Sequence, residues 1–190
     1  MEIEEAILTR RTITQFLPTV VERTMLDEIL SAGLRAQNHR LTQPWRFIVI
    51  GPETHRKLSV LFGQLQADAL PPEQGAADRE RAFETARRKL MARPKIVVVS
   101  SLLQGDSQQR KEDYAATACA IQNIQLAAWA RGIGMQWSTS HMTRNQATYE
   151  FLGCNPNHEE IVGFLFLGYP AEIPIERNRK SLSEVRRFLE

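Results

Sequence analysis

The central segment of the chain reads Tyr114-Ala-Ala-Thr-Ala-Cys-Ala-Ile-Gln-Asn-Ile-Gln-Leu-Ala-Ala-Trp-Ala130, which is apolar nearly all round. The pattern predicts a helix over residues 108–131, ended by Gly132 and Gly134, since glycine is common just after a helix C-terminus. A helix without a polar face has to be buried on every side. One chain of 190 residues would struggle to surround it, and its alanines allow another helix to approach closely. We therefore expect the chain to associate with a second copy of itself.

Segments on both sides of this helix alternate between strand and helix patterns. β-Branched and aromatic runs predict strands over residues 45–50, 95–100, 135–137 and 161–169. The spacing of apolar and charged side chains predicts helices over residues 2–11, 25–36, 53–65 and 76–92. This alternation indicates an α/β or α+β fold with a mixed sheet. No repeat or long linker divides the chain, so we expect one domain over residues 1–190, with 171–190 as a C-terminal arm that includes a short helix at 181–188.

Composition narrows the functional classes. A net charge of +2 is too small to favour nucleic acid or an anionic membrane as a partner. No apolar stretch reaches the roughly 18 residues that cross a bilayer, and the acidic N-terminus lacks the features of a signal peptide. The two cysteines, Cys119 and Cys154, form neither a CxxC pair nor a disulfide framework. A reducing, cytoplasmic location is the simplest expectation.

Two short segments near the N-terminus carry candidate binding residues. The first is Arg10-Arg11-Thr12, and the second is His39-Arg-Leu-Thr-Gln-Pro-Trp45. Guanidinium forks and a hydroxyl group close together suit a phosphate and a polyhydroxylated chain, because arginine gives bidentate and permanently charged contacts. Charged residues at a helix end are more often a solvated surface, so the triplet becomes informative only in combination with the second segment.

Together with Asp113-Tyr-Ala-Ala116, Gly132-Ile-Gly134 and Gly163-Phe-Leu-Phe-Leu-Gly-Tyr-Pro170, these two segments resemble the nitroreductase family over nearly the whole chain. The compact short form of the family, with a histidine four residues before the glutamine of Gln-Pro-Trp, is most similar. The resemblance implies an α+β fold: a three-layer α/β/α arrangement with a central mixed, mainly antiparallel sheet and a long buried helix. It also implies FMN as cofactor, NAD(P)H as co-substrate and a homodimer.

The resemblance assigns cofactor contacts to the two N-terminal segments. Arg10 and Arg11 would hold the flavin's phosphate or its pyrimidine edge, and Thr12 the ribityl or phosphate oxygens. Arg35 and His39 are four residues apart and could share one helix-end face toward the same cofactor. They could equally be two cations placed favourably near a helix C-terminus. Gln43 would hydrogen-bond the flavin's polar edge.

The resemblance assigns further contacts to two later segments. Trp137, Ser138 and Thr139 would form a loop that contributes backbone amides and side chains to the flavin. The late basic residues Arg177 and Arg179 would reach the phosphate, or would otherwise form a solvated surface. No catalytic side chain is expected, because the flavin carries the chemistry. The histidines form no metal pattern, so no metal site is expected.

These features predict an FMN-dependent oxidoreductase. It would work by ping-pong hydride transfer from NAD(P)H through flavin N5 to a small-molecule electron acceptor, either a nitroaromatic, a quinone or a related compound. Departures from the family pattern at Leu41, Thr14 and Ser138 weaken any transfer of substrate specificity. Two alternatives stay open: a flavin-binding sensor or carrier with little turnover, and a flavin oxidase or dehydrogenase acting on a substrate carbon.

Overall fold

The computed structural model describes residues 1–189; Glu190, the last residue of the predicted arm, lies outside the described residues. At its centre is a sheet in the order β1-β2-β4-β3, in which every neighbouring pair of strands is antiparallel. The strands are β1 (Trp45–Val49), β2 (Lys95–Leu102), β3 (Gly134–Ser138) and β4 (Glu159–Gly168). A single parallel bridge joins Thr12 to Met135 beside the edge strand β3. The sheet is therefore mainly antiparallel, as expected.

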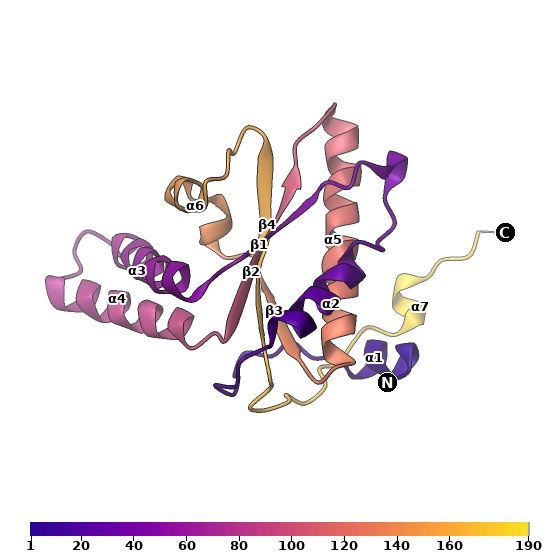
Figure 1. The fold of residues 1–190 in the computed structure, drawn as a ribbon, viewed down its shortest axis with the longest axis horizontal. Coiled ribbons are helices and arrows are strands. Elements are labelled where there is room, and N and C mark those ends of the chain that lie inside the picture. Colours follow the sequence, from indigo (N-terminus) through magenta and orange to yellow (C-terminus); the bar gives the residue numbers. More distant parts are fainter. Residues whose placement is uncertain (190) are drawn as a thin grey trace.

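Helices cover both faces of the sheet, so the three-layer α+β prediction is confirmed (Figure 1). One face packs against α2 (Arg23–Gly33) and α5 (Ser107–Trp129). The other face packs against α3 (Pro52–Asp68), α4 (Ala76–Met91) and α6 (Gln146–Leu152). The predicted strands and long helices are all present. The short helix α6 and the 3-10 helices η1 (His39–Leu41) and η2 (His141–Arg144) were not predicted.

The alternation along β2 explains why its sequence is apolar without interruption. Val97 and Val99 face the α2–α5 layer, whereas Ile96 and Val98 face the α3–α4–α6 layer. A strand that is covered on both faces needs apolar side chains at every position. The β2–β4 register shifts between Val99 and Ser100, where β4 has one extra residue. This β-bulge lies next to Gly163.

The long helix α5 is buried on the side that faces the sheet and α2. Ala120, Ile121, Ile124 and Ala128 are buried there. The opposite side of α5 is open in a single chain, with Ala115, Gln122 and Ala130 exposed. One chain therefore does not surround this helix, in line with the reasoning from its sequence. Near its C-terminal end, the Trp129 indole N–H donates to Thr9 Oγ1 at 2.9 Å, which joins α5 to α1 (Ile3–Thr9).

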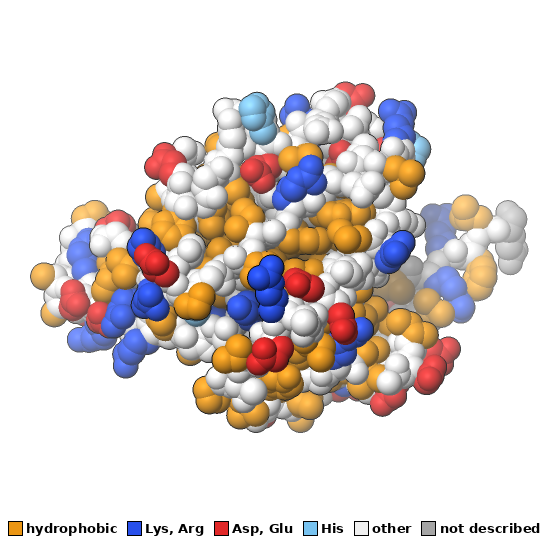
Figure 2. Space-filling model, viewed as in Figure 1, with side chains coloured by type: hydrophobic (Ala, Val, Ile, Leu, Met, Phe, Trp, Pro, Cys, Tyr) orange, Lys and Arg blue, Asp and Glu red, His pale blue; other side chains and the backbone are white. Residues whose placement is uncertain are grey.

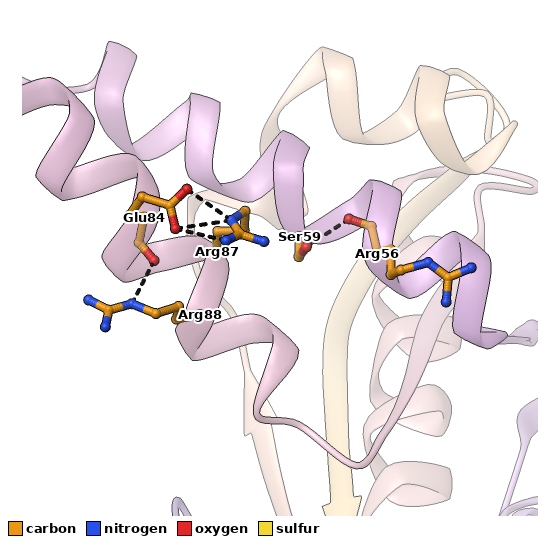
Figure 3. A network of polar contacts seen from close by, with 5 residues as sticks. All are labelled: Arg56, Ser59, Glu84, Arg87 and Arg88. Carbon is orange, nitrogen blue, oxygen red and sulfur yellow. Dashed lines mark hydrogen bonds and ion pairs between the residues drawn. The ribbon is translucent and has the colours of Figure 1, made fainter.

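The helices α3 and α4 form a hairpin that extends away from the sheet (Figure 1). Close packing at Gly63, where a Cβ atom would meet the Phe83 ring at 2.7 Å, brings the two helices together. Figure 3 shows polar contacts on this hairpin: Arg87 pairs with Glu84 at 2.8 Å, and Ser59 donates to the Arg56 carbonyl oxygen. Each of these contacts lies within one helix and stabilises that helix alone. Between the two helices, Arg79 of α4 donates to the Ala67 carbonyl oxygen of α3 at 2.8 Å, and the His55 ring nitrogen of α3 lies 2.9 Å from the Leu90 carbonyl oxygen of α4.

Charged and apolar side chains are distributed unevenly over the surface. On the face in Figure 2, hydrophobic side chains gather over the centre, and charges of both signs gather on the α3–α4 hairpin. The C-terminal arm, which contains the short helix α7 (Leu182–Val185), exposes Ile175 and Phe188. Within residues 1–189, none of the helices combines the length and the apolar character needed to cross a membrane.

Candidate functional site

A basic cavity lies where the N-terminal segment meets the C-terminal arm. Helix α1 ends at Thr9, so the two arginines predicted to bind phosphate follow directly, and Thr12 is held beside β3 by its bridge to Met135. The cavity has a volume of about 610 Å³. Its lining includes five of the predicted site residues: Arg10, Arg11, Thr12, Arg177 and Arg179. The structure therefore brings together residues that are far apart in the sequence.

Positive charge is concentrated around Arg10. Burial lowers the pKa of its guanidinium, and repulsion from Arg179 and Arg11 lowers it further. Arg11 pairs with Glu176 at 3.2 Å and donates to the Leu8 carbonyl oxygen at 2.9 Å. Within residues 1–189, no carboxylate pairs with Arg10. An anion in this cavity would relieve the repulsion and would find guanidinium donors already in place.

A second cavity adjoins the first, because Thr14 lines both. Its volume is about 510 Å³, and its lining includes Lys89 from the last turn of α4, Arg93 from the connection between α4 and β2, and Gln136 from β3. The Gln136 Oε1 atom is buried and has no hydrogen-bond partner among the described residues. Sequence reasoning missed all three residues. The available signal was Gln136 itself, a polar residue between two large apolar residues, Met135 and Trp137.

Arg93 forms part of the wall of this second cavity. Its guanidinium lies over the Phe166 ring at 5.0 Å and the Phe16 ring at 5.6 Å, and it donates to the Thr14 carbonyl oxygen at 2.6 Å. Burial lowers the pKa of this guanidinium. Cation–π contacts on two rings replace part of its lost hydration. Arg93 therefore fixes the segment that contains Thr14 against the sheet.

The segment at the end of β3 differs from its prediction. Trp137 and Ser138 belong to the strand, and the expected loop begins only at Thr139. The Trp137 indole N–H donates to the Val162 carbonyl oxygen at 3.2 Å, and the ring packs against the core. These contacts engage the Trp137 side chain within the protein. Because successive residues of a strand point to opposite faces, Gln136 and Ser138 face the other way. Ser138 lies partly open, and Thr139 is exposed.

The expectation that Arg35 and His39 share a helix face is wrong. Helix α2 ends at Gly33 and not near Ala36, and the chain continues in tight turns with Leu34 N–H bonded to the Ser31 carbonyl and Arg35 N–H to the Ala32 carbonyl. His39 begins the separate helix η1. Both side chains are exposed, Arg35 in the turn after α2 and His39 in η1. The helical pattern of the sequence continued past the point where the backbone turns.

The η1 segment lies toward the end of α5 opposite to α1, the helix that leads into the basic cavity (Figure 1). Thr42 contacts Asp113 near the N-terminal end of α5, whereas Thr9 contacts Trp129 at its C-terminal end. At 1.5 Å per residue, these two contact points are about 24 Å apart along the helix axis. A single chain therefore places His39 and Gln43 in one group and the residues of the basic cavity in another.

Comparison with known proteins identifies the family. The sequence pattern described as "Nitroreductase family" matches residues 7–169. The chain belongs to the nitroreductase family. This membership confirms the resemblance seen in the sequence and the expectation of an enzyme, an oxidoreductase of this family. Among residues 1–189, no cluster of histidine, cysteine and acidic side chains could hold a metal ion.

Individual members of the nitroreductase family match over most of their length. "Putative NAD(P)H nitroreductase YdjA" of Escherichia coli strain K12 is 31% identical, over 90% of this chain and 89% of its own length. The crystal structure of a nitroreductase-like family protein from Bacillus cereus has a TM-score of 0.85 at 29% identity, covering 100% of this chain and 97% of that one. The crystal structure of a nitroreductase from Desulfovibrio desulfuricans in complex with FMN has a TM-score of 0.76 at 20% identity, covering 100% and 98%.

Proposed function

We propose that the chain is an FMN-dependent oxidoreductase that binds the FMN phosphate in the basic cavity. The observation that carries this proposal is the convergence of the Arg10, Arg11 and Arg179 side chains on one cavity, where the single carboxylate of the lining, Glu176, pairs with Arg11 alone among the described residues. Like charges that converge in a partly buried site are costly unless an anion neutralises them. Thr12 and Arg177 line the same cavity and add a hydroxyl group and a further cation. A phosphate dianion attached to a polyhydroxylated chain matches this set of donors.

The adjoining cavity suits the flavin ring. The pyrimidine edge of the flavin presents one N–H donor between two carbonyl acceptors. The unpartnered Gln136 oxygen offers an acceptor, and Lys89 and Arg93 offer positive charge in the same cavity. Because Thr14 lines both cavities, phosphate and ring would occupy neighbouring spaces that join at that residue. Ser138 and Thr139 lie at the end of the strand that contains Gln136, and they form the proposed rim of this site.

When bound, FMN would accept a hydride from NAD(P)H at N5 and pass reducing equivalents to an acceptor such as a nitroaromatic or a quinone. The residues of the chain would bind and orient the cofactor and tune its potential. A lysine or arginine beside the pyrimidine edge stabilises negative charge there and so raises the reduction potential. The FMN complex of the Desulfovibrio desulfuricans relative and the name of the Escherichia coli relative as an NAD(P)H nitroreductase support this assignment.

A homodimer is the proposed functional unit, with residues 1–190 as one domain of each subunit. Three apolar surfaces are open in the single chain: Ile7 and Leu8 on α1, the outer side of α5, and Ile175 on the arm. A second copy packed along α5 would bury them. It would also allow Arg35 and His39 of one subunit to approach the basic cavity of the other, across the separation that one chain cannot close. Gln43 belongs to the same group.

The first experiment is a visible absorbance spectrum of the purified protein before and after anaerobic addition of NADPH or NADH. A two-band flavin spectrum that bleaches with the nicotinamide and returns with a quinone or nitro compound is expected. A flavin that stays oxidised would favour a sensor or carrier. A colourless protein that also fails to bind added FMN would overturn the cofactor assignment.

The arginine assignment is tested by removing one charge. Arg10→Ala should lose most of the bound FMN while the dimer stays folded. Arg23→Ala is the matched control, because Arg23 is exposed on α2 and pairs only with Asp27 at 3.8 Å. Light scattering after size exclusion measures the oligomeric state, and flavin absorbance per protein measures loading. Equal loading in both variants would show that the phosphate binds elsewhere.

A further inference from the structure

The segment between Asn38 and Gln43 has an unusual backbone. Arg40, Leu41 and Gln43 have φ angles of 57°, 52° and 46°, and they are the only positive-φ residues other than glycine in the described part of the chain. Residues with a Cβ atom rarely adopt this left-handed conformation. Such conformations persist only where the surrounding structure holds them, and they gather at functional sites. Some contact must therefore fix this segment.

A chain of hydrogen bonds supplies that contact. The Gln43 backbone N–H donates to Asn38 Oδ1 at 2.6 Å, and Asn38 Nδ2 donates to Thr42 Oγ1 at 2.9 Å. Thr42 Oγ1 in turn donates to Asp113 Oδ1 on α5. Asn38 thus closes the segment on itself, and Thr42 joins the closed segment to the long helix. Among the described residues, the Thr42–Asp113 bond is the one side-chain hydrogen bond that connects the segment to α5; on the other side, Arg46 of β1 donates to the Gln43 carbonyl oxygen at 3.1 Å.

The position of Asp113 is not explained by the helix that contains it. Asp106 is the N-cap of α5 and accepts the Gln109 backbone N–H, so Asp113 lies beyond the first turn and caps nothing. Asp113 is nonetheless only 2% exposed, and its Oδ2 atom has no partner among residues 1–189. A buried carboxylate with a single partner is costly. The hydrogen bond that Asp113 Oδ1 accepts from Thr42 is the one side-chain contact, among the described residues, that can offset this cost.

We propose that Asp113 is a positioning residue that, through Thr42, fixes the strained segment 38–43 and so presents His39 and Gln43 for flavin binding. This inference rests on the proposed function, because it gives the two side chains a ligand. Exposed side chains on a free segment would lose conformational entropy whenever a ligand ordered them. A segment that is already fixed avoids that loss. The predicted consequence is tighter FMN binding without any direct contact between Asp113 and the cofactor.

The test compares Thr42→Val with Thr42→Ser in the full chain. Valine has nearly the shape of threonine but removes the hydroxyl group, whereas serine keeps it. In the flavin-free protein, hydrogen exchange of the Gln43 amide should be at least about tenfold faster in Thr42→Val and close to wild type in Thr42→Ser. The Kd for FMN should rise at least about tenfold in Thr42→Val and should be restored in Thr42→Ser. Rescue by serine separates the hydroxyl group from packing.

Thr117→Val is the matched control. Thr117 is a buried threonine of α5 whose Oγ1 donates only to the Asp113 backbone carbonyl oxygen, at 2.9 Å. It should change neither the exchange of segment 38–43 nor the Kd. If exchange rises in Thr42→Val but the Kd does not, the positioning role is wrong while FMN binding stands. If Thr42→Ser matches Thr42→Val, the hydrogen bond is not the cause. If the wild-type protein binds no FMN, the proposed function fails, and this inference fails with it.

Discussion

Replacing Gly163 with alanine tests how the sheet positions the end of β3. Gly163 lies next to the β-bulge of β4, where its neighbour is the Trp137 ring. An added Cβ would overlap the indole nitrogen and would stand 3.1 Å from the Ser138 carbonyl oxygen. The ring would have to move, and its hydrogen bond to the Val162 carbonyl would break. Because Ser138 ends the same strand and Thr139 follows it directly, the disturbance should also reach the proposed flavin site.

The expected magnitude follows from two effects. Overpacking a well-packed core costs about 1–3 kcal/mol. Leaving the indole N–H without its acceptor costs about 1 kcal/mol more. The free energy of unfolding should therefore fall by about 2–4 kcal/mol. For a chain of this length, each kcal/mol lowers Tm by about 2–4 °C, so the expected decrease is roughly 5–15 °C.

Urea unfolding of the flavin-free protein, followed by circular dichroism, measures this change. Gly75→Ala is the matched control: Gly75 caps α4 with an ordinary φ of −73°, and an added Cβ would meet nothing within 4 Å. Its cost should stay below about 1 kcal/mol, the loss expected for a poorer N-cap residue. Adding Trp137→Phe to Gly163→Ala should recover part of the loss. If Gly163→Ala is as stable as Gly75→Ala, the close contact with Trp137 does not constrain the sheet.

The remaining predictions concern three other residues of the fold. Burial and the Glu159 carboxylate raise the pKa of Cys154 to about 11, so little of this thiol is ionised at pH 8. Its alkylation by iodoacetamide at that pH, measured by mass spectrometry, should therefore be about a hundredfold slower than in the urea-unfolded chain. Because the folded pKa is raised, this thiol should also reduce stability as pH rises from about 9 to 11, where only the unfolded chain ionises. Arg93→Met should lower the free energy of unfolding in urea by about 1–3 kcal/mol, since the Thr14 carbonyl oxygen loses its donor. Gly33→Ala should lower the free energy of unfolding by about 1–2 kcal/mol, although alanine has the better helix propensity, because the new Cβ would stand 2.8 Å from Ile124 Cδ1. Adding Ile124→Val removes that methyl group and should restore thermal stability.

The layers of the fold were predictable because burial leaves a plain pattern in the sequence. Continuous apolar runs at β2 and β4 predicted strands covered on both faces, and the structure covers both. The apolar stretch of α5 predicted the central helix for the same reason. Helix α6 was missed because it has only seven residues, too few for a helical period to become clear.

The candidate site was predictable only in part, because binding residues follow the path of the backbone and not the pattern of burial. Arg10, Arg11 and Thr12 are consecutive, and they do meet Arg177 and Arg179 in one cavity. Arg35 and His39 were misplaced, because the end of α2 depends on turns that the helical spacing does not encode. Lys89 and Arg93 resemble any other charge at the end of an exposed helix. Only the packing of α4 against the sheet places them beside Gln136.

The position of α5 connects these observations. Its C-terminal end is joined to α1, which leads into the basic cavity, and its N-terminal half is joined through Asp113 to segment 38–43. One rigid helix thus sets the distance between the two groups of candidate residues, about 24 Å along its axis. That separation is too large for both groups to serve one cavity within a chain. The same helix leaves its outer side open, with Ala115, Gln122 and Ala130 exposed. If a second copy packs antiparallel along that side, each basic cavity meets the other chain's segment 38–43. The burial of α5 and the completion of the site would then have one physical cause.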